Sequence, residues 1–202
     1  MLSRRIFALL LGTLCMGGMR AQVIEFEANG YKYHTLTKNG LTIMFAPLPT
    51  HVREYSIIQV AVSNGSRYSY ILRPEDFVFT GEGGTPIPAA PARQVVSDMI
   101  SKARRGDVVR LVTAYESGIY GNTQYKSTNG YEQRRQSALA EVSSTKLKAA
   151  AAASAIAFVQ TKLGPGESTD GALFYATAGK PLGAGRLQVR AAGSLFDFPV
   201  LP

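Results

Sequence analysis

The chain is poor in the residues that build metal and thiol sites. Its 202 residues include one Cys, two His and no Trp. The single Cys15 lies near the N-terminus, so removal of that segment would exclude disulfide frameworks, cysteine zinc sites and thiol catalysis. Charged residues make up only 18% of the chain and hydrophobic residues 46%, a composition outside the range of disordered sequences. We therefore expect one folded domain or two small ones.

The N-terminus has the pattern of a bacterial export signal. Arg4 and Arg5 precede an apolar run that begins at Ile6, and small residues lead on to Ala21. The apolar run is about a dozen residues long, well short of the ~20 that a membrane-spanning helix needs. We predict a Sec-type signal peptide over residues 1–21, cleavage after Ala21, and export to the periplasm or the extracellular space.

The charge balance is basic, with 22 Lys and Arg against 14 Asp and Glu and a net charge of +8. Loss of residues 1–21 removes three arginines and no acid, which leaves a net charge of +5. The remaining arginine pairs have acidic neighbours on predicted helices, which favours solvated helical faces. We expect no nucleic-acid partner for an exported chain. A membrane-surface role for residues 91–163 stays open as the weaker alternative.

The pattern from Val23 to Phe79 is that of β-strands. The Asn39-Gly40 pair between two such runs favours a tight hairpin turn with positive φ angles. A second hairpin is predicted from the alternating run Ile58–Ser63, the turn Asn64-Gly65-Ser66 and a return strand that ends at Leu72. One face of this second hairpin should be buried.

A helical pattern follows over residues 91–163. Apolar residues recur at helical spacing between 91 and 119, and the stretch 132–163 contains neither Gly nor Pro. The alanine run 149–153 allows another backbone to approach closely, in the core or at a partner. Strand patterns return after Gly164-Pro165-Gly166, and they cover residues 173–175, 186–190 and 195–200.

This order of strands, helices and strands predicts an antiparallel sandwich that is completed from both ends of the chain. Residues 22–90 supply its N-terminal part, residues 91–163 a helical insertion, and residues 164–202 its C-terminal part. We expect that deletion of residues 91–163 leaves a folded β protein that no longer captures its partner.

Several short motifs carry a family resemblance. A strand ends in Asn64-Gly65-Ser66, Pro74-Glu75-Asp76-Phe77 follows, and the turn Leu163–Ser168 precedes Gly171–Phe174. In these motifs the chain resembles the bacterial extracellular immunoglobulin-like domains that are sometimes called telokin-like. The resemblance implies a mainly β fold, an immunoglobulin-like antiparallel β-sandwich carrying a helical block, used for adhesion, display or complex assembly. It implies no catalytic residues.

Residues for catalysis are few. His34 and His51 lack the i, i+2 or i, i+4 spacing of metal ligands, although Glu25, Glu27 or Glu54 could join either one in half of a metal site. The sequence contains no Gly-x-Ser-x-Gly elbow and no glycine-rich loop that opens a helix. We therefore predict no catalytic, cofactor-binding or metal-binding residue.

The predicted function is that of an exported non-enzymatic interaction or structural module that docks onto a protein partner in a cell-envelope or extracellular assembly. The alternative is an envelope hydrolase that uses carboxylates or the two histidines. The tyrosines in and beside the link between the predicted helices suit protein or glycan contact, with packing inside the fold as the other interpretation. An arginine pair on the following predicted helix is a candidate for the same contact. These candidate partner-binding residues are Tyr115, Tyr120, Tyr125, Tyr131, Arg134 and Arg135.

Overall fold

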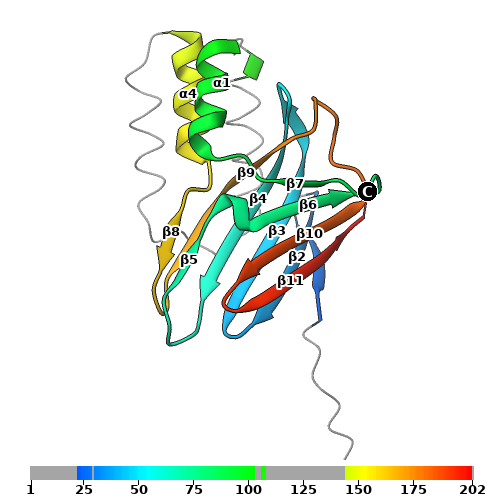
Figure 1. The fold of residues 1–202 in the computed structure, drawn as a ribbon, viewed down its shortest axis with the longest axis vertical. Coiled ribbons are helices and arrows are strands. Elements are labelled where there is room, and N and C mark those ends of the chain that lie inside the picture. The colour runs from blue at the N-terminus through cyan, green and yellow to red at the C-terminus, as the bar shows by residue number, and fades with distance from the viewer. Residues whose placement is uncertain (1–21, 29, 103–105, 108–143, 202) are drawn as a thin grey trace, which may run out of the picture.

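The strands form antiparallel sheets in a computed structural model that describes residues 22–28, 30–102, 106–107 and 144–201 (Figure 1). The first sheet has the order β1-β2-β3-β4-β9, with β1 Ile24–Ala28, β2 Tyr31–Lys38, β3 Leu41–Val52, β4 Tyr55–Asn64 and β9 Ser168–Ala176. The second sheet has the order β11-β10-β6-β7, with β11 Ser194–Val200, β10 Gly185–Ala191, β6 Phe77–Gly81 and β7 Pro86–Pro88. A small ribbon pairs β5, Tyr70–Leu72, with β8, Thr161–Leu163.

The two main sheets pack face to face as a β-sandwich. Alternate residues of the first sheet, such as Ile43 and Val60, share one buried cluster with Leu187 and Phe198 of the second sheet. The ring of Phe198 meets the ring of Phe45 edge to face, with 5.0 Å between ring centroids. Period-two alternation therefore sends one side of each sheet into a common core, as the sequence pattern predicts.

Strands from distant parts of the chain meet in both sheets. In the first sheet β4 pairs antiparallel with β9, from Tyr55 opposite Ala176 to Ser63 opposite Ser168. In the second sheet β6 pairs with β10. Each sheet therefore combines strands from the N-terminal and the C-terminal part of the chain.

Two helices pack against one end of the outer face of the first sheet, beside β4 and β9 (Figure 1). These are α1, Ala92–Lys102, and α4, Thr145–Ile156, which lie side by side and fall between β7 and β8 in the chain (Figure 1). They form a second buried cluster with the sheet, whose members include Val52, Tyr55, Ile57, Phe174, Val95, Met99, Ala149, Ala152, Ala153 and Ile156. The alanine run is therefore a packing surface, because its small side chains let the helix approach its neighbours closely.

This second core argues against the expectation that the chain still folds without residues 91–163. Deletion of residues 91–163 would expose Tyr55, Ile57 and Phe174, which are nearly inaccessible to solvent in the intact chain. Exposing that much apolar surface costs several kcal/mol by the usual ~25 cal/mol per Å². We therefore no longer expect the shortened chain to fold as a β protein.

The hairpin predicted at Asn39-Gly40 is confirmed, with φ angles of 50° and 76° and Lys38 opposite Leu41. The second predicted hairpin is wrong, because β4 pairs with β3 and β9 while the return segment β5 pairs with β8. The reason lies in the buried Asn64. Its Nδ2 lies within 3.1 Å of the carbonyl oxygens of Tyr68, Leu163 and Gly164, which turns the chain away from the first sheet.

The predicted helix over residues 132–163 extends too far at its C-terminal end. The helix α4 ends at Ile156, and residues 161–163 form β8. The amide of Phe158 donates to the carbonyl of Ala172 on β9 at 2.8 Å, and its ring packs edge to face against Phe77. Burial of this aromatic ring and of Leu163 in the sandwich core outweighs the helix propensity of the segment. The strands predicted at 173–175, 186–190 and 195–200 are confirmed within β9, β10 and β11.

Candidate functional site

The predicted partner-binding residues Tyr115, Tyr120, Tyr125, Tyr131, Arg134 and Arg135 lie outside the residues that the structure describes. Their role stays a prediction. The described part of the chain offers three other places to search for function: the two histidines, the ionisable cluster at the start of β4, and the outermost strand β1.

The histidines lie apart. His34 faces the sandwich core from β2, where its ring stacks on Phe45 with 4.9 Å between centroids. Phe45 and His51 lie on the same strand, β3, six residues apart, which corresponds to roughly 20 Å along an extended strand. The two imidazoles therefore do not share one site. No group of three or more His, Cys, Asp and Glu side chains within the described ranges is arranged to hold a metal ion.

His34 does lie beside one of the glutamates that were considered with it. Nδ1 of His34 lies 3.2 Å from Oε1 of Glu25, although the two groups do not meet the geometry of a well-aligned hydrogen bond. Burial lowers the pKa of His34, and the Glu25 carboxylate opposes that shift. The imidazole is therefore neutral at pH 7, and the contact ties β1 to β2 without a full ion pair.

Ionisable groups also gather where α1 meets the start of β4. The Tyr55 hydroxyl donates to Oδ2 of Asp98 at 2.6 Å, and Lys102 Nζ donates to Glu54 Oε1 at 2.9 Å. Lys102 Nζ also lies 3.2 Å from Oδ1 of Asp98, one turn earlier on the helix. These contacts join a helix to a strand at the edge of the second core.

The protonation states of this cluster fit a structural tie. Burial raises the pKa of the Tyr55 hydroxyl far above neutrality, and the hydroxyl in turn lowers the pKa of Asp98. Lys102 lowers the pKa of Glu54, while Glu54 raises the pKa of Lys102. All four groups keep their ordinary charge at pH 7, and no pair has pKa values tuned towards proton exchange at that pH.

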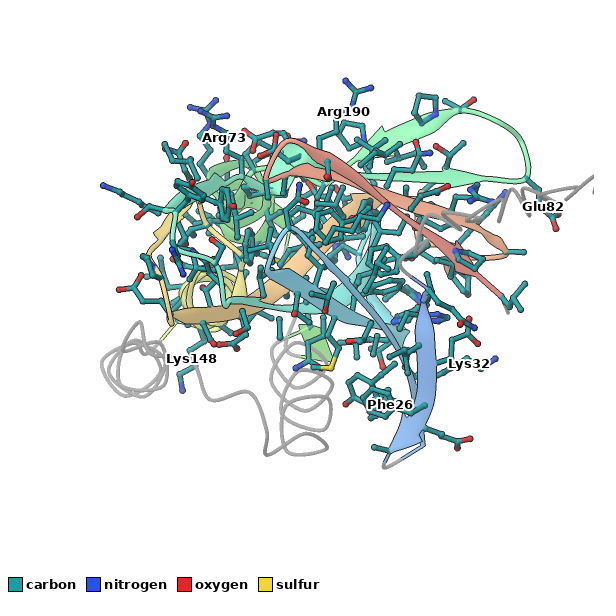
Figure 2. The ribbon with its side chains drawn as sticks, turned by 90° about the horizontal axis from the view of Figure 1, so that it is seen from below. Phe26, Lys32, Arg73, Glu82, Lys148 and Arg190 are labelled. Atoms are coloured by element: carbon teal, nitrogen blue, oxygen red, sulfur yellow. The ribbon has the colours of Figure 1, made fainter. Side chains whose placement is uncertain are left out.

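The outermost strand β1 differs from every other long strand. Its first four residues are exposed, and its last is half-buried. Ile24 is 60% exposed and Phe26 39%, and the Phe26 ring stacks on Tyr33 of β2 with 5.2 Å between centroids. Figure 2 shows β1 at the rim of the molecule, with Phe26 and Lys32 on opposite faces of this rim.

The two faces of β1 differ in chemistry. Ile24 and Phe26 lie on the face that carries Tyr33, whereas Glu25 and Glu27 lie on the other face, opposite His34 and Lys32. Among the described residues β1 pairs with β2 alone, so its other edge presents unpaired backbone groups within that part of the chain. A row of unpaired N–H and C=O groups is a template for another strand.

The sequence pattern from Val23 onward predicts β structure at β1 but not the exposure of this strand. The available signal was the alternation of Glu25 and Glu27 with Ile24 and Phe26. Two carboxylates on one strand face cannot enter an apolar core unpaired, so that face of the strand had to reach solvent.

Comparisons with known proteins identify no relative of this chain. No protein-family model, no curated protein and no solved structure matches the chain. No helix within the described residues is long and apolar enough to cross a membrane.

Proposed function

We propose that this chain is an exported, non-enzymatic interaction module that docks onto a protein partner of a cell-envelope assembly by accepting a strand at the edge of β1. In strand addition, backbone hydrogen bonds supply affinity and alternate side chains supply specificity. The edge of β1 provides both elements, together with an apolar face formed by Ile24 and Phe26.

The observation that supports this proposal is the exposure of β1 on both faces. Natural proteins usually shorten, cover or twist such edges because they promote association. Here a five-residue strand keeps an aromatic and an aliphatic side chain in solvent next to an open ladder. A partner strand would cover these side chains and complete the ladder.

A sandwich of this kind is shared with immunoglobulin-like domains at the level of architecture. The immunoglobulin pattern distributes early consecutive strands over both sheets. In this chain the first four strands are neighbours in one sheet. The proposed docking role therefore depends on the edge of β1 and not on membership in that family.

The test is capture of a partner from the native envelope fraction by the tagged chain and two variants. Ile24→Ser with Phe26→Ser should abolish capture while the thermal unfolding temperature stays close to that of the wild type. Tyr68→Ser with Ile71→Ser removes two other exposed apolar side chains and serves as the matched control. Equal capture by the β1 variant and the control variant would contradict the proposal.

A further inference from the structure

We infer that the strand accepted by β1 belongs to a different protein and alternates Lys or Arg with apolar residues, its basic side chains facing Glu25 and Glu27. This inference rests on the proposed docking at β1 and specifies its partner. It follows from the faces of β1 and from the charges that its neighbours leave in place.

Side chains directly opposite each other in neighbouring antiparallel strands lie on the same face of the sheet. A strand added to β1 therefore places alternate residues beside Ile24 and Phe26, and the residues between them beside Glu25 and Glu27. Apolar residues on the first face would extend the stack of Phe26 on Tyr33. Cations on the second face would lie next to two carboxylates.

Within the described residues, the two carboxylates of this second face lie beside one cation, Lys32 of β2. Glu25 is 39% exposed, and its contact is with His34, whose imidazole is neutral at pH 7 because burial lowers its pKa. Glu27 is exposed and lies opposite Lys32 in the ladder, without forming an ion pair with it or with another described residue. Two carboxylates beside one lysine leave the edge of β1 with an excess of negative charge, in a chain whose net charge is +8.

The same charges disfavour a second copy of this chain as the occupant. A symmetric dimer joins two antiparallel β1 strands about an axis perpendicular to the sheet, which pairs the Glu face of one copy with the Glu face of the other. Every such register that pairs three or more residues of β1 places Glu25 or Glu27 opposite a glutamate of the other copy. Like charges directly opposite destabilise a strand pair.

The experiment uses the folded chain and three short amidated peptides that alternate valine with lysine, glutamate or threonine. Binding is measured at low salt as protection from hydrogen exchange of the amides in residues 24–28. We expect the lysine peptide to protect β1 with an affinity about tenfold higher than the threonine peptide, and the glutamate peptide to bind most weakly. Glu25→Lys with Glu27→Lys should reverse this order.

A matched variant separates the site from general attraction. Glu75→Lys with Glu82→Lys changes the net charge by the same amount at two exposed positions outside β1, and it should keep the wild-type order. If the order follows net charge in both variants, or if threonine and lysine peptides bind equally, the inferred basic partner is wrong while strand docking stands. If no peptide protects β1, docking at this edge is itself wrong. If sedimentation shows a dimer, and Glu25→Lys makes that dimer more stable, the occupant of the β1 edge is a second copy of this chain and not a different protein.

Discussion

The strands β4 and β1 lie in the same sheet and have opposite surroundings. In β4 every residue except Ser63 is buried, because the sandwich core covers one face and other buried side chains cover the opposite face. In β1 four of five residues are exposed. Ile58 of β4 is fully buried, whereas Ile24 of β1 is 60% exposed. An isoleucine therefore stabilises the fold in β4, whereas in β1 it forms part of an exposed apolar surface.

This difference separates two tasks within one sheet. The central strand holds the sheet, the second sheet and the helices together, so changes there should act on folding. The outer strand depends on its ladder with β2 and on the contacts of Phe26 and Glu25. Changes there should act on association and leave folding almost unchanged.

The largest predicted effect comes from making the same substitution, isoleucine to alanine, in each of these two strands. Ile58→Ala removes a fully buried side chain from the sandwich core and should lower the free energy of unfolding by about 2–5 kcal/mol. Ile24→Ala removes a mostly exposed side chain and should change it by no more than about 0.5 kcal/mol. Urea unfolding of both variants measures the two values. Equal losses would show that β1 belongs to the core.

A smaller effect is expected from backbone packing beside β4. A Cβ atom on Gly171 of β9 would lie 2.6 Å from the Cα atom of Phe158, so Gly171→Ala forces two backbone segments apart. We expect a loss of about 1–3 kcal/mol in the free energy of unfolding. Gly83→Ala is the control, since a Cβ atom there meets nothing within 4 Å. A stable Gly171→Ala variant would mean that the segment around Phe158 moves without cost.

Much of this fold could be predicted because its signals are local. The Asn39-Gly40 turn and the alternation in β10 and β11 require no knowledge of distant residues. The errors arise where distant partners decide the structure. The carbonyl groups that bind Asn64 come partly from residues about 100 positions away, and the helix C-terminus is set by the burial of Phe158 against β9 and Phe77.

The candidate site was predictable in part. The contact of His34 with Glu25 was among the pairs considered, but the neutral, core-facing position of the imidazole depends on which face of β2 is covered. The surface against which the alanine run packs was not predictable for the same reason. The sequence of α4 shows small side chains, and only the apolar outer face of β4 and β9 shows what they pack against.

The next prediction concerns the tie at the start of β4. Tyr55→Phe removes the hydroxyl that donates to Asp98 and should lower the free energy of unfolding at pH 7 by about 1 kcal/mol. The hydroxyl is the largest cause of the lowered pKa of Asp98. The stability linked to this carboxyl is present above its unfolded pKa of about 3.9 and is lost as the pH falls further.

The variant should therefore lose less stability than the wild type upon acidification below about pH 4. Urea unfolding at pH 7 and at pH 3 provides the comparison. Val52→Ala changes the same apolar cluster without touching Asp98 and should retain the pH dependence of the wild type. A constant difference between Tyr55→Phe and wild type at both pH values would show that the hydroxyl acts by packing alone.

The smallest predicted effect concerns His34 of β2, the strand that pairs with β1. Burial lowers the pKa of His34 in the folded chain, so the unfolded chain binds a proton first as the pH falls. The associated stability is complete above the unfolded pKa of about 6.5 and decreases as the pH falls towards the folded pKa. His34→Phe keeps a ring on Phe45 and should flatten the unfolding free energy between pH 7 and pH 5. A wild-type curve that is already flat would contradict this.

A second variant sharpens the same prediction through the charges around the imidazole. Glu25 on β1 raises the pKa of His34, Lys32 on β2 lowers it, and Phe45 on β3 carries no charge. Glu25→Gln removes the raising influence, so the folded pKa falls further and the loss of stability on acidification becomes larger than in the wild type. A basic strand bound at β1 would pair with the carboxylate of Glu25 and weaken its influence on His34. The loss of stability on acidification would then increase, as in Glu25→Gln. The titration of His34 would then report on occupancy of the edge from inside the core.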